Sequence, residues 1–314
     1  MSTNVLTPKS GMIRPAYDRA KTEEVVAKLK LFSGVWIDTP YHHQLQSGLD
    51  TVRLLGQGHN DGSLRALRCL APPSTGKTTV AEKYRDLINK EAGSPGKKKP
   101  VLLVALSNSM TSKRLISAIL MELGDPHATN GGEQLLAKRL EDLVKELQIE
   151  LIIIDEVHHL ATSRNVAEVI NALKTLLNRR ICPLALLGTK DAEKLLTSNG
   201  ELAQRIANIA DIEPLPRNAS GRVILHRFLS GFDQELQRLG IFGCQSDFTN
   251  EQCVDGLLKT TKGVMGLSAR ILQNSLETAI RRNADRIETY DVSKAIDTWA
   301  IPSGFCKTNP FTKG

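Results

Sequence analysis

A phosphate-binding pattern near the start of the chain constrains the fold most. Residues 67–79 have the sequence LRCLAPPSTGKTT, in which a short apolar segment is followed by a loop of small residues and by Gly-Lys-Thr at the start of a helical pattern. In a strand, loop and helix of this order, backbone N–H groups and the helix N-terminus point at nucleotide phosphates. The predicted nucleotide-binding residues are Pro73, Ser74, Thr75, Gly76, Lys77, Thr78 and Thr79.

Two of these side chains have specific roles in such a loop. Lys77 is expected to reach the β- and γ-phosphates of ATP, and the hydroxyl of Thr78 is expected to bind Mg²⁺. The usual pattern has a glycine five residues before Gly76, where this chain has Ala71. A methyl group is tolerated where the backbone keeps φ negative. ATP use therefore stays the expectation, and the effect of Ala71 on ATP affinity stays open.

A second motif supplies the other half of the predicted site. Residues 151–154 are continuously apolar and end in Asp155 and Glu156. Such a run is typical of a strand buried on both faces of a parallel sheet, and ligands bind at the carboxyl ends of these strands. Asp155 is expected to bind Mg²⁺, directly or through water, and Glu156 to polarise the water that attacks the γ-phosphate. A buried strand with a polar end is the alternative, but the two motifs in this order favour nucleotide binding.

Length and cysteine usage restrict the class of protein. The 314 residues are enough for one large α/β domain and a smaller one. The chain has no apolar run near the roughly 18 residues of a membrane span and no pattern typical of a signal peptide. Its five cysteines form no C-x-x-C pair, and no further ligand is suitably spaced from His158 and His159. We therefore expect a cytoplasmic protein with no membrane segment and no zinc site.

The charge balance favours a polyanionic partner. The formal net charge is +7 and the sequence pI is about 9.1. A generic solvated basic surface would give the same values. Only 4% of the residues are aromatic, which argues against a surface that stacks single-stranded bases. Contact with the backbone of duplex DNA is the better expectation.

Alternating strand and helix patterns predict the architecture. Strands are expected at about 64–70, 101–106, 150–154, 183–188 and 209–213, with helical patterns between them, so the sheet should be parallel with helices on both faces. After residue 216 only helical patterns follow, up to about residue 300. The expected divisions are an N-terminal arm (1–40), an α/β nucleotide-binding domain (41–216), a helical lid (217–300) and a loose C-terminal tail (301–314).

Three further residues are candidates for catalysis or nucleotide sensing. Thr189 ends the fourth predicted strand, where a hydroxyl can orient the attacking water; it could equally cap the next helix. Arg205 precedes the fifth strand and is expected to reach a neighbouring subunit's nucleotide, as an arginine finger does. Arg270 opens a lid helix and is expected to reach the phosphates of its own subunit. Ordinary surface arginines are the alternative in both cases.

The ordered set of motifs resembles an AAA+ ATPase over about residues 40–300. Within that superfamily the chain is similar to the TniB/TnsC group of DNA-transposition regulators, which are related to IstB and MuB. Three stretches carry this narrower resemblance: 151–160 (LIIIDEVHHL), 186–190 (LLGTK), and 201–206 with the proline-bounded segment that follows it. The compact length and the small all-helical lid also match.

This resemblance implies both a fold and an activity. The implied fold is α/β, a P-loop AAA+ five-stranded parallel sheet with helices on both faces, followed by a small all-helical lid. The implied activity is a slow, regulatory ATPase that uses ATP and Mg²⁺. Such proteins assemble on double-stranded DNA as homo-oligomeric rings or filaments. They recruit or activate a DDE transposase and work with a target-selection protein.

Two polar segments are the candidates for DNA contact in such an assembly. Residues 107–114 follow the second strand, and residues 161–165 follow the acidic pair. Both offer hydroxyls, amides and positive charge, which contact phosphates without reading sequence. The predicted DNA-binding residues are Lys113, Arg114 and Arg164, and the lysine triplet at 97–99 is the next candidate. An exposed helix start explains Lys113 and Arg114 equally well.

Two other functions fit parts of the pattern. A helicase loader or replication-initiator-like adaptor shares the ATPase motifs, but an initiator usually carries an added DNA-reading domain, for which no room remains after residue 300. A protein-remodelling motor usually places an aromatic residue in its channel loop. The corresponding segment here, residues 107–112, is polar and has no aromatic residue.

Overall fold

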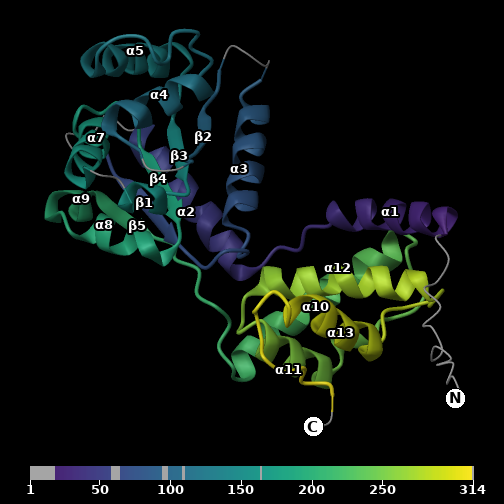
Figure 1. Ribbon diagram of the computed structural model, residues 1–314. Helices are drawn as coiled ribbons and strands as arrows, with labels where there is room; N and C mark the ends of the chain where they lie inside the picture. The colour runs from purple at the N-terminus through teal and green to yellow at the C-terminus, as the bar shows by residue number, and fades with distance from the viewer. Residues whose placement is uncertain (1–17, 58–63, 94–97, 108–109, 163–164, 313–314) are drawn as a thin grey trace, which may run out of the picture.

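The chain folds into an α/β unit followed by a helical unit (Figure 1). The computed structural model describes residues 18–57, 64–93, 98–107, 110–162 and 165–312. The α/β unit contains a five-stranded sheet in the order β2-β3-β4-β1-β5, with every neighbouring pair parallel. The strands are β1 (Ala66–Leu70), β2 (Val101–Ala105), β3 (Leu151–Asp155), β4 (Leu184–Gly188) and β5 (Ile206–Ile209). The predicted five-stranded parallel sheet is confirmed.

Helices cover both faces of this sheet, because successive strand side chains point to opposite sides. On one face the strands pack against α2 (Pro40–Gln57) and α3 (Lys77–Glu91). On the other face they pack against α4 (Ser112–Glu122), α5 (Glu133–Glu146) and α7 (Val166–Asn178). Short helices follow the strand ends: α6 (His158–Ala161), η1 (Lys190–Ala192), α8 (Glu193–Thr197) and α9 (Gly200–Arg205).

The fifth strand begins earlier than the sequence pattern predicts. The expected span was 209–213, whereas β5 is Ile206–Ile209 and follows α9 directly. Beyond the strand, the side chains of Ala210 and Ile212 are buried. Their backbone N–H groups still donate to the carbonyl oxygens of Arg68 and Leu70, so the segment continues alongside β1 beyond the strand itself.

The helical unit has its own apolar core. It consists of α10 (Ala219–Arg238), η2 (Asp247–Thr249), α11 (Glu251–Thr260), α12 (Met265–Arg281), α13 (Thr289–Ala295) and the π-helical η3 (Ile296–Ala300). The N-terminal helix α1 (Arg19–Ser33) lies along α12 rather than on the α/β unit (Figure 1). Val25 and Phe32 of α1 are buried in the core of the helical unit, and Phe32 stacks on Phe232 at 5.3 Å between ring centroids.

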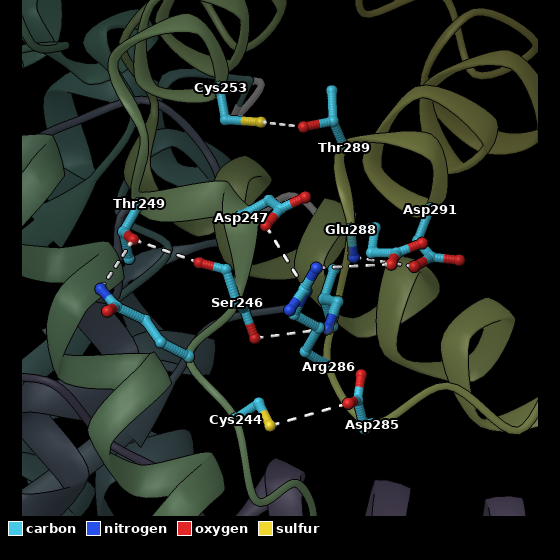
Figure 2. A network of polar contacts seen from close by, with 12 residues as sticks. Cys244, Ser246, Asp247, Thr249, Cys253, Asp285, Arg286, Glu288, Thr289 and Asp291 are labelled. Carbon is cyan, nitrogen blue, oxygen red and sulfur yellow. Dashed lines mark hydrogen bonds and ion pairs between the residues drawn. The ribbon is translucent and has the colours of Figure 1, made fainter.

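A polar network ties two loops of the helical unit together (Figure 2). Arg286 lies 3.6 Å from a carboxylate oxygen of Asp247 and 3.8 Å from one of Glu288. Glu288 and the fully buried Asp291 form a capping box at the start of α13, and the Asp291 carboxylate also accepts from Arg282. The carboxylates of Asp247, Glu288 and Asp291 thus have hydrogen-bond or ion-pair partners within the helical unit, so they have a structural role.

The C-terminal residues that the structure describes pack on the helical unit. The ring of Phe311 lies against Gly256, and the side chain of Asn309 donates to the backbone oxygen of Ser293. Asn309 and Phe311 thus attach this end of the described chain to the helical unit, and the division of the chain into arm, domain, lid and tail stays a prediction. Among the described residues, no helix is both long and apolar enough to span a membrane.

Candidate functional site

The phosphate-binding loop lies between β1 and α3 and lines a cavity of about 340 Å³. Gly76 has a φ of +88°, and a side chain there would meet the ring of His42, 3.0 Å from a Cβ position. The backbone at Ala71 keeps φ negative, as the tolerance of its methyl group requires. The cavity brings together predicted residues from three loops: Pro73, Ser74, Thr75, Gly76, Lys77, Thr78, Thr79, Glu156 and Thr189.

Lys77 is held inside this loop. Its side chain is buried, and its ammonium group donates to the carbonyl oxygens of Ala71 at 3.2 Å and Pro72 at 3.3 Å. Both acceptors are neutral backbone groups, and Lys77 forms no ion pair with any residue in the described ranges. An anionic phosphate would therefore be a stronger partner for this charge than the groups it now contacts.

Thr78 and Asp155 meet across the site. The Thr78 hydroxyl donates to Oδ2 of Asp155 at 2.6 Å, and Oδ1 of Asp155 accepts from the backbone N–H of Glu156 at 2.8 Å. Asp155 is only 1% exposed and forms no ion pair with a described residue. A buried carboxylate without a cation is costly, and a hydroxyl beside a carboxylate is a donor set that suits Mg²⁺. The predicted magnesium ligands therefore fit that ion.

Glu156 stands at the rim of the cavity in an unusual backbone conformation. Its φ is +60°, a region that costs a non-glycine residue about 1–3 kcal/mol and that is often found at functional sites. The Oε2 atom of Glu156 lies 3.1 Å from Nδ1 of His158, which also lines the cavity. Thr189 is the N-cap residue of η1, but its hydroxyl donates to the carboxylate of Asp191 at 2.8 Å and makes no capping hydrogen bond. Thr189 also lines the cavity.

The two predicted arginines lie outside the lining of this cavity. Arg205 is the last residue of α9, beside the edge strand β5, and is half-buried. Arg270 is exposed, and its guanidinium donates to Gln273 at 2.7 Å. The lid nevertheless contacts the loop at Gly266, where a Cβ atom would lie 1.9 Å from the carbonyl oxygen of Ser74.

Sequence reasoning missed a histidine behind the loop. Nε2 of His42 lies 3.2 Å from the carbonyl oxygen of Thr75, and its ring stacks on Trp36 at 4.6 Å between centroids. Burial lowers the pKa of His42, so the ring is neutral and its N–H can hold the Thr75 carbonyl. Nothing in the spacing of the sequence marks His42, because the contact joins residues 33 positions apart.

Two of the predicted DNA-binding residues lie at a separate hollow. Lys113 and Arg114 are exposed in the first turn of α4 and line a space of about 740 Å³ beside the edge strand β2. Neither forms an ion pair with a residue in the described ranges. Arg164 lies outside the described residues, as does Lys97 of the lysine triplet, while Lys99 donates to the backbone oxygen of Glu122.

Comparison with known families identifies the chain. A model of the family described as bacterial TniB protein matches residues 31–213, which is more than half of the chain. The chain belongs to the TniB family. The matched region runs from the end of α1 to just beyond β5 and so contains the phosphate-binding loop, the acidic pair and Arg205. The comparison with curated proteins returned no match.

Solved structures share the fold. The ORC2 protein of Aeropyrum pernix, solved as ADPNP and ADP complexes, matches with a TM-score of 0.61 and 17% identity over 85% of this chain and 71% of its own. The ORC1 protein of the same organism, in complex with DNA, matches with a TM-score of 0.59 and 18% identity over 86% and 69%. Drosophila ORC bound to DNA matches with a TM-score of 0.58 and 12% identity over 94% and 70%. The TniB chain therefore has the AAA+ fold that the sequence predicted.

Proposed function

We propose that this TniB chain is an ATP-dependent, non-sequence-specific DNA-binding regulator of DNA transposition. It binds and slowly hydrolyses ATP with Mg²⁺, oligomerises on target DNA, and recruits or activates a DDE transposase alongside a target-selection protein. The observation that carries the proposal is the meeting of Lys77, Thr78 and Glu156 at one cavity, with Asp155 hydrogen-bonded to Thr78, in a chain of this family. The nucleotide complexes of the ORC2 match support ATP as the ligand.

The nucleotide site has the parts that phosphoryl transfer needs. Lys77 binds the phosphates, Thr78 and Asp155 hold Mg²⁺, and Glu156 polarises the attacking water while Thr189 orients it. Bound Mg²⁺ offsets the charge of the phosphates. The structure supports these roles by proximity: each of these residues lines the cavity or is hydrogen-bonded to one that does.

Glu156→Gln is expected to retain ATP binding and to slow hydrolysis about 10²-fold, because an amide keeps the shape of the side chain but cannot take a proton from water. The ATP-bound, DNA-bound assembly should then accumulate. Steady-state phosphate release and binding of a fluorescent ATP analogue measure both effects. Glu168→Gln, an exposed change in the first turn of α7, is the control. An unchanged turnover rate would remove Glu156 from the mechanism.

The position of Lys113 and Arg114 supports contact with a polyanion. They occupy the N-terminal turn of α4, where the helix dipole favours negative charge, and the first turn of that helix has no acidic residue. Two cations at this end of a helix without an ion pair are unfavourable unless an external anion approaches. DNA phosphates, repeated from subunit to subunit, provide that anion.

Replacing Lys113 and Arg114 together by Ala is expected to weaken binding to all duplex sequences alike. The affinity of the wild type should fall with salt with a log–log slope of about −0.9 per phosphate neutralised, and the double variant should flatten that slope. Lys138→Ala with Lys145→Ala removes the same charge from α5, where both lysines already pair with acidic residues. Normal DNA binding by the first double variant, or a loss for some sequences only, would exclude this surface.

A helicase loader or initiator-like adaptor is the alternative function. The ORC1 and Drosophila ORC matches, both solved with DNA, are compatible with this alternative because those proteins share the fold. Negative-stain imaging with ATP and duplex DNA separates the two functions. The transposition regulator should coat the duplex as rings or a filament in an ATP-dependent manner. Absence of any ATP-dependent assembly on DNA would favour the adaptor.

A further inference from the structure

A histidine contacts the proposed general base. Nδ1 of His158 lies 3.1 Å from Oε2 of Glu156, and the two side chains are 22% and 39% exposed. Both line the nucleotide cavity. Nδ1 of His158 is buried and forms no hydrogen bond with a described group, and Oε2 of Glu156 is an acceptor within 3.1 Å of it. The contact thus joins a half-buried imidazole to the acid that is proposed to take the proton from water.

The backbone fixes this pair in place. Glu156 is in the left-handed region, and the next residue, Val157, donates its N–H to the carbonyl oxygen of Leu187 in β4 at 2.9 Å. The N–H of His159 then donates back to the carbonyl oxygen of Glu156 at 3.0 Å. This tight turn brings His158 to the same side as Glu156. The ring of His159 packs on that of His158 at 4.4 Å between centroids and limits its movement.

The two carboxylate oxygens of Glu156 have different surroundings. Oε2 faces His158, whereas no described residue donates a hydrogen bond to Oε1. A carboxylate anchored through one oxygen presents the other in a fixed direction. During hydrolysis the water oxygen forms a bond to the γ-phosphorus and its proton passes to Oε1. The bond from the γ-phosphorus to the bridging oxygen breaks, with the electron pair leaving on ADP.

We propose that His158 is a positioning residue for ATP hydrolysis: its Nδ1–H holds Oε2 of Glu156, so that Oε1 faces the attacking water. The inference rests on the proposed function, because it requires Glu156 to act as the base. In this arrangement the loop before α3 binds the phosphates, and His158 is not needed to hold them. Its effect therefore falls on kcat and not on KM.

Three variants test the inference in the full-length chain with ATP and duplex DNA. His158→Leu is expected to lower kcat about tenfold, because a displaced Glu156 carboxylate loses much of its catalytic effect. The same variant should leave KM within about twofold of wild type. His158→Asn places an amide N–H near the position of Nδ1 and should restore kcat to within about threefold of wild type. His226→Leu, a change to an exposed histidine of α10 outside the nucleotide cavity, is the control and should stay close to wild type.

A double-variant measurement connects the effect to Glu156. In the Glu156→Gln background, His158→Leu should cause no further loss, because the group that it positions is already absent. An equal loss in both backgrounds would show that His158 acts elsewhere and would overturn the inference. So would an unchanged kcat for His158→Leu, or a His158→Asn variant as slow as the leucine variant.

A different experimental result would contradict the proposed function itself. If Glu156→Gln hydrolyses ATP as fast as wild type, Glu156 is not the base, and the inference falls with the mechanism. If Glu156→Gln is slow while His158→Leu is normal, the mechanism stands and only the role of His158 is removed. Binding of a fluorescent ATP analogue by each variant shows that the cavity is still folded.

Discussion

Lys77→Ala is expected to abolish ATP binding, and ATP-dependent assembly on DNA with it. The ammonium group lies inside the loop, and among the described residues its hydrogen bonds go only to the carbonyl oxygens of Ala71 and Pro72. A phosphate provides a charged acceptor in place of these neutral ones, so removal of the ammonium deletes the strongest direct contact that the loop offers. The exposed lysines of α3 are fixed elsewhere on the helix and do not replace it.

Titration with a fluorescent ATP analogue measures this effect directly. Lys90→Ala is the matched control, because Lys90 lies on the same helix α3, is exposed, and stands in the last turn, away from the loop. Wild-type affinity for the analogue in the Lys77 variant would contradict the assignment of the loop. Thermal unfolding of the variant without nucleotide should match the wild type, since the ammonium makes only two weak internal hydrogen bonds.

The nucleotide loop and the sheet could be predicted because their determinants are local. Gly76, Lys77 and Thr78 lie next to one another, and the apolar run before Asp155 identifies a buried strand by itself. The fifth strand was displaced in the prediction because it is an edge strand, with Ala207 and Ile209 exposed. The fully buried apolar positions of this segment begin only at Ala210, after the strand has ended.

The parts that could not be predicted depend on contacts between distant segments. The contact of Gly266 with the loop at Ser74 joins the lid to the α/β unit, and that of His42 with Thr75 joins α2 to the loop. Glycine and histidine occur in many environments, so the residue type at positions 266 and 42 does not reveal which distant segment each one contacts. The docking of α1 on α12 likewise follows from the shape of a core that only the folded chain creates.

Arg205→Ala is expected to leave ATP binding by the monomer largely intact and to lower hydrolysis by a factor on the order of 10³. Arg205 does not line the cavity of its own subunit and forms no hydrogen bond or ion pair with a described residue. It stands at the end of α9 beside the edge strand β5, where a second subunit can approach. From there its guanidinium can stabilise charge on the phosphoryl group of ATP bound to a neighbouring subunit.

A mixing experiment decides whether Arg205 acts between subunits. Each Lys77→Ala subunit lacks nucleotide binding but supplies Arg205, and each Arg205→Ala subunit supplies an intact nucleotide site. Mixed oligomers therefore contain interfaces at which both parts are present, so ATPase activity should return above that of either variant alone. Arg227→Ala, an exposed arginine on α10, is the control and should need no rescue. Absence of rescue at every ratio, with mixed oligomers verified, would show that Arg205 acts within its own subunit or not at all.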